Sequence, residues 1–369
     1  ITFAFTRFSL NVALSYNEVP PAYFVKANVH ILLISLSGFD TDLVAGPAVL
    51  GLMHMSLLEP QHVGKSKKKV INKNIDTSKI FDADVVNMKH NLVAAGILTK
   101  ILPHMIHSKS LLILTHACKL CASLALYFPN KPELARSGCY HALIDIVQGS
   151  HKQVTEAIQY PALQALVNIT NGADANRNLA VELSGIKPLL ITIRISNNEG
   201  MLLEACKVIT NIAFCNSFTA ASILGLAGDV VLIKLLDTTD VVRNGPIIHA
   251  GLSALANMAN NETNQAHIGA AVGIVELTLR VIEHAREPYV VTAAANLLLA
   301  LVLRNKGNKA RLGVKGMCPV VMKRIIYHSQ HHSRQDHIFC VERLCMALAS
   351  VLLYEPNHNY FHGKRAARF

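Results

Sequence analysis

The chain has 369 residues, of which 51% are hydrophobic and only 16% are charged, and it contains no Trp. This composition excludes a disordered chain and supplies enough apolar surface for a continuous core. Lys and Arg outnumber Asp and Glu by 35 to 24, which gives a formal net charge of +11 with neutral His. Such an excess attracts anionic partners, which include acidic protein segments, nucleic acid and membrane headgroups.

The first third of the chain begins irregularly. The chain starts at Ile1 and not at Met, and residues 1–26 show neither a repeat pattern nor a secretory cleavage pattern, so we interpret them as an N-terminal cap. We interpret residues 27–63 as a degenerate repeat that precedes the regular ones. Residues 64–80 form a Lys-rich insertion, which we expect to be a solvated loop or a basic contact surface. Its basic segment consists of Lys65, Lys67, Lys68, Lys69 and Lys73.

An internal repeat organises residues 81–316. A glycine followed by an apolar stretch recurs every 42 to 47 residues. After each glycine we expect a short apolar helix, a polar break, a longer helix rich in Ala and Leu, and an Asn-bearing turn. The glycines are Gly96, Gly138, Gly185, Gly228, Gly273 and Gly316.

Each part of this pattern has a physical reason. Glycine adopts the left-handed conformation that ends one helix and turns sharply into the next. Pro188 and Pro319 lie just inside the following helix, where a missing N–H costs little. The apolar residues recur every three or four positions, so each helix has one stripe to bury. No single repeat can bury its stripes alone, and the repeats must therefore stack into a solenoid.

The start Gly185-Ile-Lys-Pro-Leu-Leu and the core Ala254-Leu-Ala-Asn257-Met resemble armadillo repeats. Tyr127-Phe-Pro-Asn130 and Tyr354-Glu-Pro-Asn357 occupy the same place in their repeats and support this resemblance. It implies an all-α, right-handed solenoid of about eight three-helix units that forms one domain over residues 1–369. Residues 317–369 would form the last repeat and a basic tail. HEAT repeats are the alternative, which the glycine-led short helix disfavours.

In armadillo proteins the third helices line a concave groove, where one asparagine per repeat holds the backbone of an extended peptide. Carried over by position, this resemblance assigns partner binding to Lys119, Ser123, Gln164, Asn168, Lys207, Asn211, Ser253, Asn257 and Asn296, with Ala300 and Ser350 continuing the asparagine positions. The alternative is that these asparagines only brace the repeats. Importin-α would need Trp beside each asparagine, so the absence of Trp disfavours nuclear-signal binding.

Two further groups of residues could carry chemistry. Eight cysteines lie mostly in apolar stretches without disulfide spacing, which predicts reduced thiols in an intracellular protein. Cys118 and Cys121 lack the second pair that a zinc site needs. The segment from His328 to His337, with Cys340 beyond it, has no regular ligand spacing. We interpret it as a polar loop that gains charge below about pH 6.5, with a metal site as the less favoured alternative.

No phosphate loop, nucleophile elbow or zinc-protease motif occurs in the sequence. We therefore predict a non-catalytic scaffold without a cofactor, which binds extended or acidic protein segments and acts in the cytoplasm or on the cytoskeleton. The alternative is a structural subunit embedded in a cytoskeletal or ribonucleoprotein assembly, in which the basic segments contact acidic tails or RNA. Nucleic acid is a secondary partner, and a nuclear location remains open. We predict no membrane span, because the uncharged stretch from Val208 to Gly228 is interrupted by polar residues such as Asn211 and Asn216 and the stretch from Tyr289 to Leu303 is too short.

Overall fold

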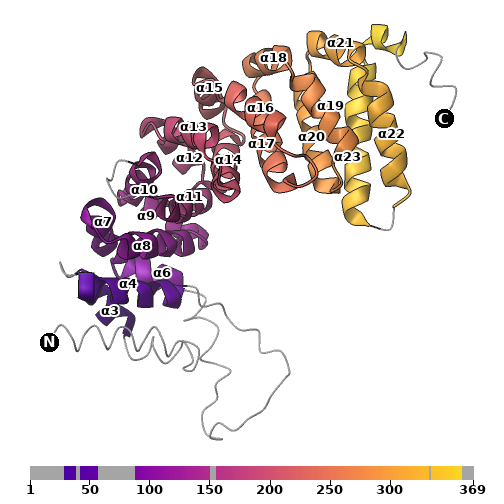
Figure 1. The fold of residues 1–369 in the computed structure, drawn as a ribbon. Coiled ribbons are helices and arrows are strands. Elements are labelled where there is room, and N and C mark those ends of the chain that lie inside the picture. Colours follow the sequence, from indigo (N-terminus) through magenta and orange to yellow (C-terminus); the bar gives the residue numbers. More distant parts are fainter. Residues whose placement is uncertain (1–28, 39–41, 57–87, 150–154, 332–333, 360–369) are drawn as a thin grey trace, which may run out of the picture. The chain divides into compact units, whose positions relative to one another are not determined.

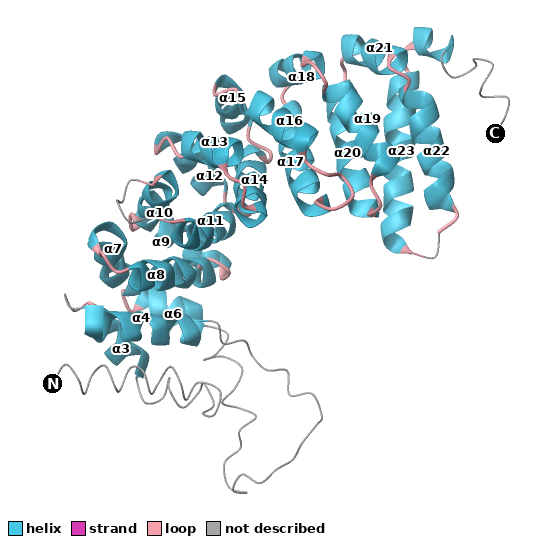
Figure 2. Ribbon diagram, viewed as in Figure 1, coloured by secondary structure: helices cyan, strands magenta, loops and turns pink. Residues whose placement is uncertain are grey.

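The computed structural model describes residues 29–38, 42–56, 88–149, 155–331 and 334–359 (Figure 1). Helices are the only regular elements within these ranges (Figure 2). The predicted cap at residues 1–26 and the Lys-rich insertion at 64–80 lie outside the described residues. Contacts divide the chain into two compact units, residues 1–176 (unit 1) and residues 177–369 (unit 2). The two units are described separately below.

Unit 1 begins with a helix pair and continues with helices grouped in threes. Its elements are α3 (Val29–Ser37), α4 (Asp42–Ser56), α6 (Met88–Ala94), α7 (Ile97–His107), α8 (Leu111–Leu124), η3 (Phe128–Asn130), α9 (Lys131–Arg136), α10 (Cys139–Gln148) and α11 (Glu156–Thr170). The division between the units falls within α12 (Asp174–Glu182).

Unit 2 continues the same order of first, second and third helices. Its elements are α13 (Ile186–Ile195), α14 (Glu199–Ala213), α15 (Ser217–Gly225), α16 (Gly228–Thr238), α17 (Gly245–Ala259), α18 (Glu262–Ala270), α19 (Ile274–His284), α20 (Pro288–Val302), α21 (Lys306–Val314), α22 (Met317–Ser329), α23 (Gln335–Leu352) and η4 (Glu355–Asn357). The predicted all-helical repeat architecture is therefore confirmed.

The core of each unit is a stack of third helices. In unit 1, α4 packs on α8 and α8 on α11, while in unit 2 the stack runs from α14 through α17 and α20 to α23. Small residues also allow the second and third helices to approach closely. A Cβ on Gly251 of α17, for example, would lie 2.7 Å from the Leu236 side chain of α16, which would have to move.

The turns into the second helices agree with the sequence prediction at four of the six glycines. Gly96, Gly138, Gly273 and Gly316 have φ between 80° and 89°, in the left-handed region. The prediction is wrong at Gly185, whose φ is −72°, and at Gly228, which is the first residue of α16. There the residues before the glycines, Ser184 and Ala227, take the left-handed conformation instead.

Position 228 nevertheless needs glycine, because Ile223 leaves no room there for a side chain. A Cβ at this position would lie 2.4 Å from the Ile223 side chain and 2.8 Å from its carbonyl oxygen. The turn has therefore shifted by one residue while the glycine has kept a packing role. A sequence pattern shows that a turn needs glycine. It does not show whether the glycine is needed for a left-handed backbone or for lack of space for a side chain.

Candidate binding face on the third helices

The exposed sides of the third helices carry the residues that the resemblance assigned to partner binding. In unit 1, α8 exposes Lys119, and α11 presents Gln164 and Asn168, both half-buried. Ser123 is instead buried and donates its hydroxyl to the carbonyl of Ser56, 2.9 Å away. Ser123 is thus a brace between α4 and α8, and we remove it from the set of exposed residues.

In unit 2 the same side of the stack is polar with half-buried amides. Asn211, Ser253, Asn257 and Asn296 are all half-buried on α14, α17 and α20. The assignment of Ala300 to this side is wrong, because Ala300 is buried with 7% exposure. The half-buried residue of that turn of α20 is its neighbour Leu299.

Two of the asparagines hydrogen-bond to the preceding third helix. The Nδ2 atom of Asn168 donates to the carbonyl of Ala122 and that of Asn257 to the carbonyl of Thr210, each over 2.9 Å. Thr210 in turn donates its hydroxyl to Ala250, also over 2.9 Å. These bonds show that Asn168 and Asn257 brace the stack. A side-chain amide has two donor hydrogens and one acceptor oxygen, so each amide keeps binding capacity beyond its brace.

The charged and aromatic groups on this face differ in whether they are free to contact a partner. The ammonium of Lys207 lies 3.1 Å from Glu204, whose carboxylate is largely buried, so this lysine is already paired. Lys119 has no ion-pair partner among the described residues. On α17 and α20, the rings of His249 and Tyr289 lie 5.4 Å apart edge to face and add an apolar patch to the amides.

A second set of asparagines, which sequence reasoning left without a role, links the repeats on the other side of the third helices. Each lies at the start of a first helix, is buried, and donates from Nδ2 to two carbonyls at 2.8 to 3.1 Å. One carbonyl belongs to the preceding third helix and the other to the first helix one repeat earlier. We call this set the Asn ladder: Asn130, Asn176, Asn308 and Asn357.

After two of the ladder asparagines, the next residue ties the first helix to the end of the third helix of the same repeat. Lys131, which is 6% exposed, donates to the carbonyl of Asn171. Arg177, which is 5% exposed, donates to the carbonyl of Phe214 over 3.0 Å and lies over its ring. Both cations are thus structural. The sequence signal for the ladder was present in the two Tyr-x-Pro-Asn turns, but spacing alone did not reveal the acceptors.

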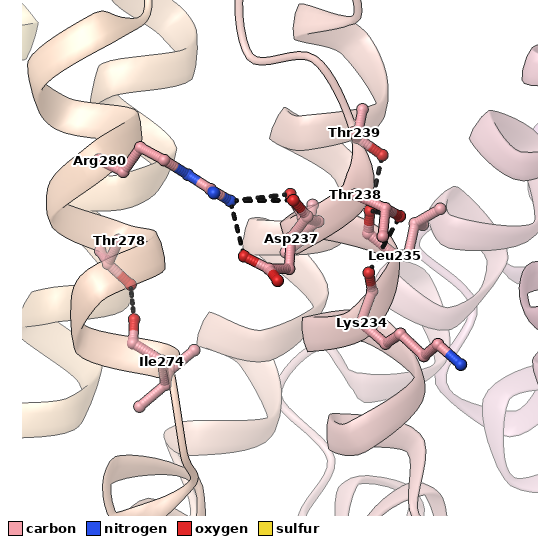
Figure 3. A network of polar contacts seen from close by, with 9 residues as sticks. Lys234, Leu235, Asp237, Thr238, Thr239, Ile274, Thr278 and Arg280 are labelled. Carbon is pink, nitrogen blue, oxygen red and sulfur yellow. Dashed lines mark hydrogen bonds and ion pairs between the residues drawn. The ribbon is translucent and has the colours of Figure 1, made fainter.

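Two clefts lie along the second helices of unit 2. One of about 760 Å³ lies beside α13, α16 and the start of α17. The other, of about 630 Å³, lies between α16 and α19. Figure 3 shows a polar contact at the second cleft, where the guanidinium of Arg280 lies 3.0 Å from the Asp237 carboxylate and donates to the Asp237 carbonyl over 3.2 Å. This contact joins two neighbouring second helices.

The histidine-rich segment forms a packed cluster at the α22–α23 hairpin. The Nδ1 atoms of His328 and His337 lie 3.0 Å apart, and the ring of His331 stacks on His337. Burial, with a contribution from the Arg324 charge, lowers the pKa of His328 to about 4. The prediction of a polar loop is therefore wrong for His328, which lies inside α22 with its ring fully buried.

The structure adds three findings on metal, membrane and thiol chemistry. Within the described ranges, no three His, Cys, Asp or Glu side chains gather as a metal site would require. No individual helix there has the length and apolar character of a membrane span, although the bent pairs α15–α16 and α18–α19 meet these criteria when joined. The eight cysteines are all free thiols.

This arrangement of helices is similar to that of solved armadillo-repeat structures. An engineered protein aligns with 94% of this chain and 74% of its own, with a TM-score of 0.75 and 19% identity. A designed armadillo repeat protein in complex with the peptide (KR)4 aligns with 68% of this chain and 99% of its own, with a TM-score of 0.59 and 19% identity.

A third structure comes from work on a phosphorylation switch in the interaction between cadherin and β-catenin. It covers 98% of this chain and 61% of its own, with a TM-score of 0.66 and 16% identity. At these identities the likeness shows the fold, and it confirms the predicted armadillo-like solenoid. No family model matches the sequence, and no curated protein matches it either.

Proposed function

We propose that this protein is a non-catalytic scaffold whose third-helix faces bind extended segments of partner proteins. The observation that carries the proposal is the set of half-buried amides on stacked third helices, with hydrogen-bonding capacity left beyond the braces. The similarity to a designed armadillo protein that is in complex with a peptide supports it. We place this activity inside the cell, in keeping with the free thiols.

The chemistry of the face favours a polar or acidic partner segment. Amides hold peptide groups in register without selecting side chains, and each hydrogen bond contributes roughly 0.5–1.5 kcal/mol. Three such bonds fall well short of the about 8 kcal/mol that micromolar binding requires. The remainder must come from side-chain contacts, for which the unpaired Lys119 and the His249–Tyr289 pair are available.

The test must separate binding from bracing, because Asn168 and Asn257 do both. Asn296 has no hydrogen-bond partner within the described residues, so Asn296→Ala removes an amide from the face without removing a brace. We would combine it with Lys119→Ala and compare the partners captured from native extract at physiological salt. The matched control is Asn308→Ala, which breaks a brace away from this face.

Loss of the same partners in the face variant, and their retention in the control, is the expected result once circular dichroism shows that both variants are folded. An unchanged partner set in the face variant would refute the proposal. Salt adds a second criterion. Binding to an extended segment should change little between about 50 and 200 mM salt, whereas binding driven by phosphates weakens steeply.

A second candidate function is a structural subunit embedded in a larger assembly. Exposed apolar side chains at the turns that follow the third helices favour it, because such groups are usually covered in an assembly. They are Leu126, Phe128, Phe214, Leu303 and Leu353. Partners that survive both the face variant and high salt would support this role.

A further inference from the structure

Helix α21 is unusually basic for a first helix of this protein. The stretch from Leu303 to Lys315 contains five Lys or Arg residues and no Asp or Glu. The equivalent helix α15 contains no Asp, Glu, Lys or Arg, and α18 contains only Glu262 among these residue types. A first helix can therefore pack without cations, although Lys131 of α9 and Arg177 of α12 have structural roles.

Most of these cations are exposed and available. Lys315 pairs with Glu276 of α19, and Arg311 donates to Asn308 over 2.7 Å while remaining exposed. Arg304 and Lys306 are exposed and form no ion pair with any described carboxylate. The cationic surface of α21 is thus only partly neutralised by the protein itself.

Two of these cations occupy positions that disfavour them. Lys306 is the first residue of α21, where the positive end of the helix dipole repels a cation. Arg304 has φ of 60°, in the left-handed region that glycine or asparagine occupies at lower energy. At the equivalent turns the left-handed residue is Gly172 after α11 and Cys215 after α14, and neither is a cation. Neither cation is explained by the stability of the fold.

Exposed aliphatic side chains flank the cations. Leu303 is 61% exposed and Val314 is 64% exposed, one at each end of α21. Leu353, at the end of α23, which contacts α21, is 79% exposed. Residues 303–315 contain no aromatic side chain on which a nucleic-acid base could stack. Neither of the clefts described above is lined by α21.

We propose that α21 and its flanking turns bind the surface of an anionic membrane. Arg304, Lys306 and Arg311 would contact the lipid headgroups, and Leu303 and Val314 would insert into the boundary between headgroups and acyl chains. Cations near an anionic leaflet and apolar side chains at the interface are the two contributions that hold peripheral proteins on membranes. The contact is distinct from the third-helix face and does not depend on the proposed scaffold function.

The test is sedimentation of the full chain with phosphatidylcholine vesicles that contain or lack phosphatidylserine. The triple variant Arg304→Gln, Lys306→Gln, Arg311→Gln should lower the partition onto anionic vesicles about 100-fold, at about fivefold for each cation. The matched control Lys187→Gln, Arg194→Gln, Lys234→Gln removes the same charge from exposed positions on α13 and α16 and should leave most of the binding intact.

One single variant separates the proposed role from a structural one. Arg304→Gly relieves the left-handed strain, so it should raise the melting temperature while it lowers vesicle binding about fivefold. Leu303→Ser should weaken binding even at about 0.5 M salt, where charge contributions are largely screened.

Three outcomes would overturn the proposal. Equal loss in both triple variants would show that only net charge matters. Loss confined to a variant with Lys65, Lys67, Lys68 and Lys69 changed to Gln would assign the binding to the Lys-rich insertion. Binding to polyuridine that depends on Arg304, Lys306 and Arg311, without binding to vesicles, would make the surface a nucleic-acid site.

Discussion

Asn308 holds two neighbouring repeats together through a single amide group. Its Nδ2 atom donates to the carbonyls of Gln265 and Leu301, and a Cβ on Gly269 would lie only 2.2 Å from that atom. The asparagine therefore fits a space that a glycine one repeat earlier leaves open. Gly313 leaves the same space for Asn357, where a Cβ would come within 2.0 Å of the side-chain oxygen.

We expect Asn308→Ala to lower the free energy of unfolding by about 2–3 kcal/mol, because two buried carbonyls lose their donor. Urea denaturation followed by circular dichroism measures this loss. Asn260→Ala, at an exposed asparagine after α17, is the control and should change the stability by less than about 0.5 kcal/mol. A similar small effect at Asn308 would contradict the role assigned to the Asn ladder.

A substitution at Ala227 should increase the free energy of unfolding. Its φ of 56° places a non-glycine residue in the left-handed region, which costs roughly 1–2 kcal/mol. Ala227→Gly should therefore stabilise the protein by up to about 1 kcal/mol, after the greater entropy of glycine in the unfolded chain is subtracted. Gly273→Ala, at a left-handed glycine with free space around it, should be destabilising by a similar amount in the same thermal unfolding assay.

At the level of elements, the α22–α23 hairpin makes stability depend on pH through its buried imidazoles. Arg324 and Tyr327 of α22 and His331 just after its end face His328, and Asp336, His337 and Cys340 lie on α23. His328 has a pKa of about 4 in the folded chain against an ordinary value of 6.5. The unfolded chain therefore takes up a proton at a higher pH than the folded chain does.

The free energy of unfolding should be constant above pH 6.5 with respect to this group and should fall as the pH decreases from 6.5 towards 4. The loss is at most about 1.4 kcal/mol per pH unit for one proton. Urea denaturation at a series of pH values tests this, with His328→Gln expected to flatten the dependence. Since His141 is exposed on α10, His141→Gln should leave the curve unchanged. An unaltered slope in the His328 variant would assign the dependence elsewhere.

Some features of the helices and their turns could be predicted from the sequence, and others could not. The helix order, the repeat length and the left-handed conformation at four of the six repeat glycines could be predicted, because hydrophobic period and glycine placement are local signals. The one-residue shift at Ala227 could not, since it depends on Ile223 packing against Gly228. Bracing by Asn168 and Asn257 was open from the sequence only as an alternative to peptide binding, and the Asn ladder could not be predicted, because the acceptors in both cases are backbone carbonyls that sequence does not distinguish. The role of Asn211, Asn296 and the Lys-rich insertion in binding remains a prediction.

For the molecule as a whole, the reactivity of the cysteine thiols shows whether the chain is folded. Cys215 and Cys345 are exposed, whereas the other six are buried, and burial raises the pKa of Cys118 and of Cys206 to about 12. A thiol reagent should modify Cys215 and Cys345 rapidly in the native protein and the others only on unfolding, because the thiolate is the reactive form. Mass spectrometry of the labelled peptides measures this order. Rapid labelling of Cys118 would contradict the packing of α8 in unit 1.

The direction of the interrepeat hydrogen bonds has a consequence for how the chain is made. The donors Asn130, Asn176, Asn308 and Asn357, like Asn168 and Asn257 on the third helices, all reach carbonyls of the repeat that precedes them in sequence. A ribosome releases the N-terminal repeat first. The repeats that carry these asparagines therefore find the acceptors for them already present on the preceding repeat as they emerge, whereas the bond from Thr210 to Ala250 forms only when the later repeat arrives.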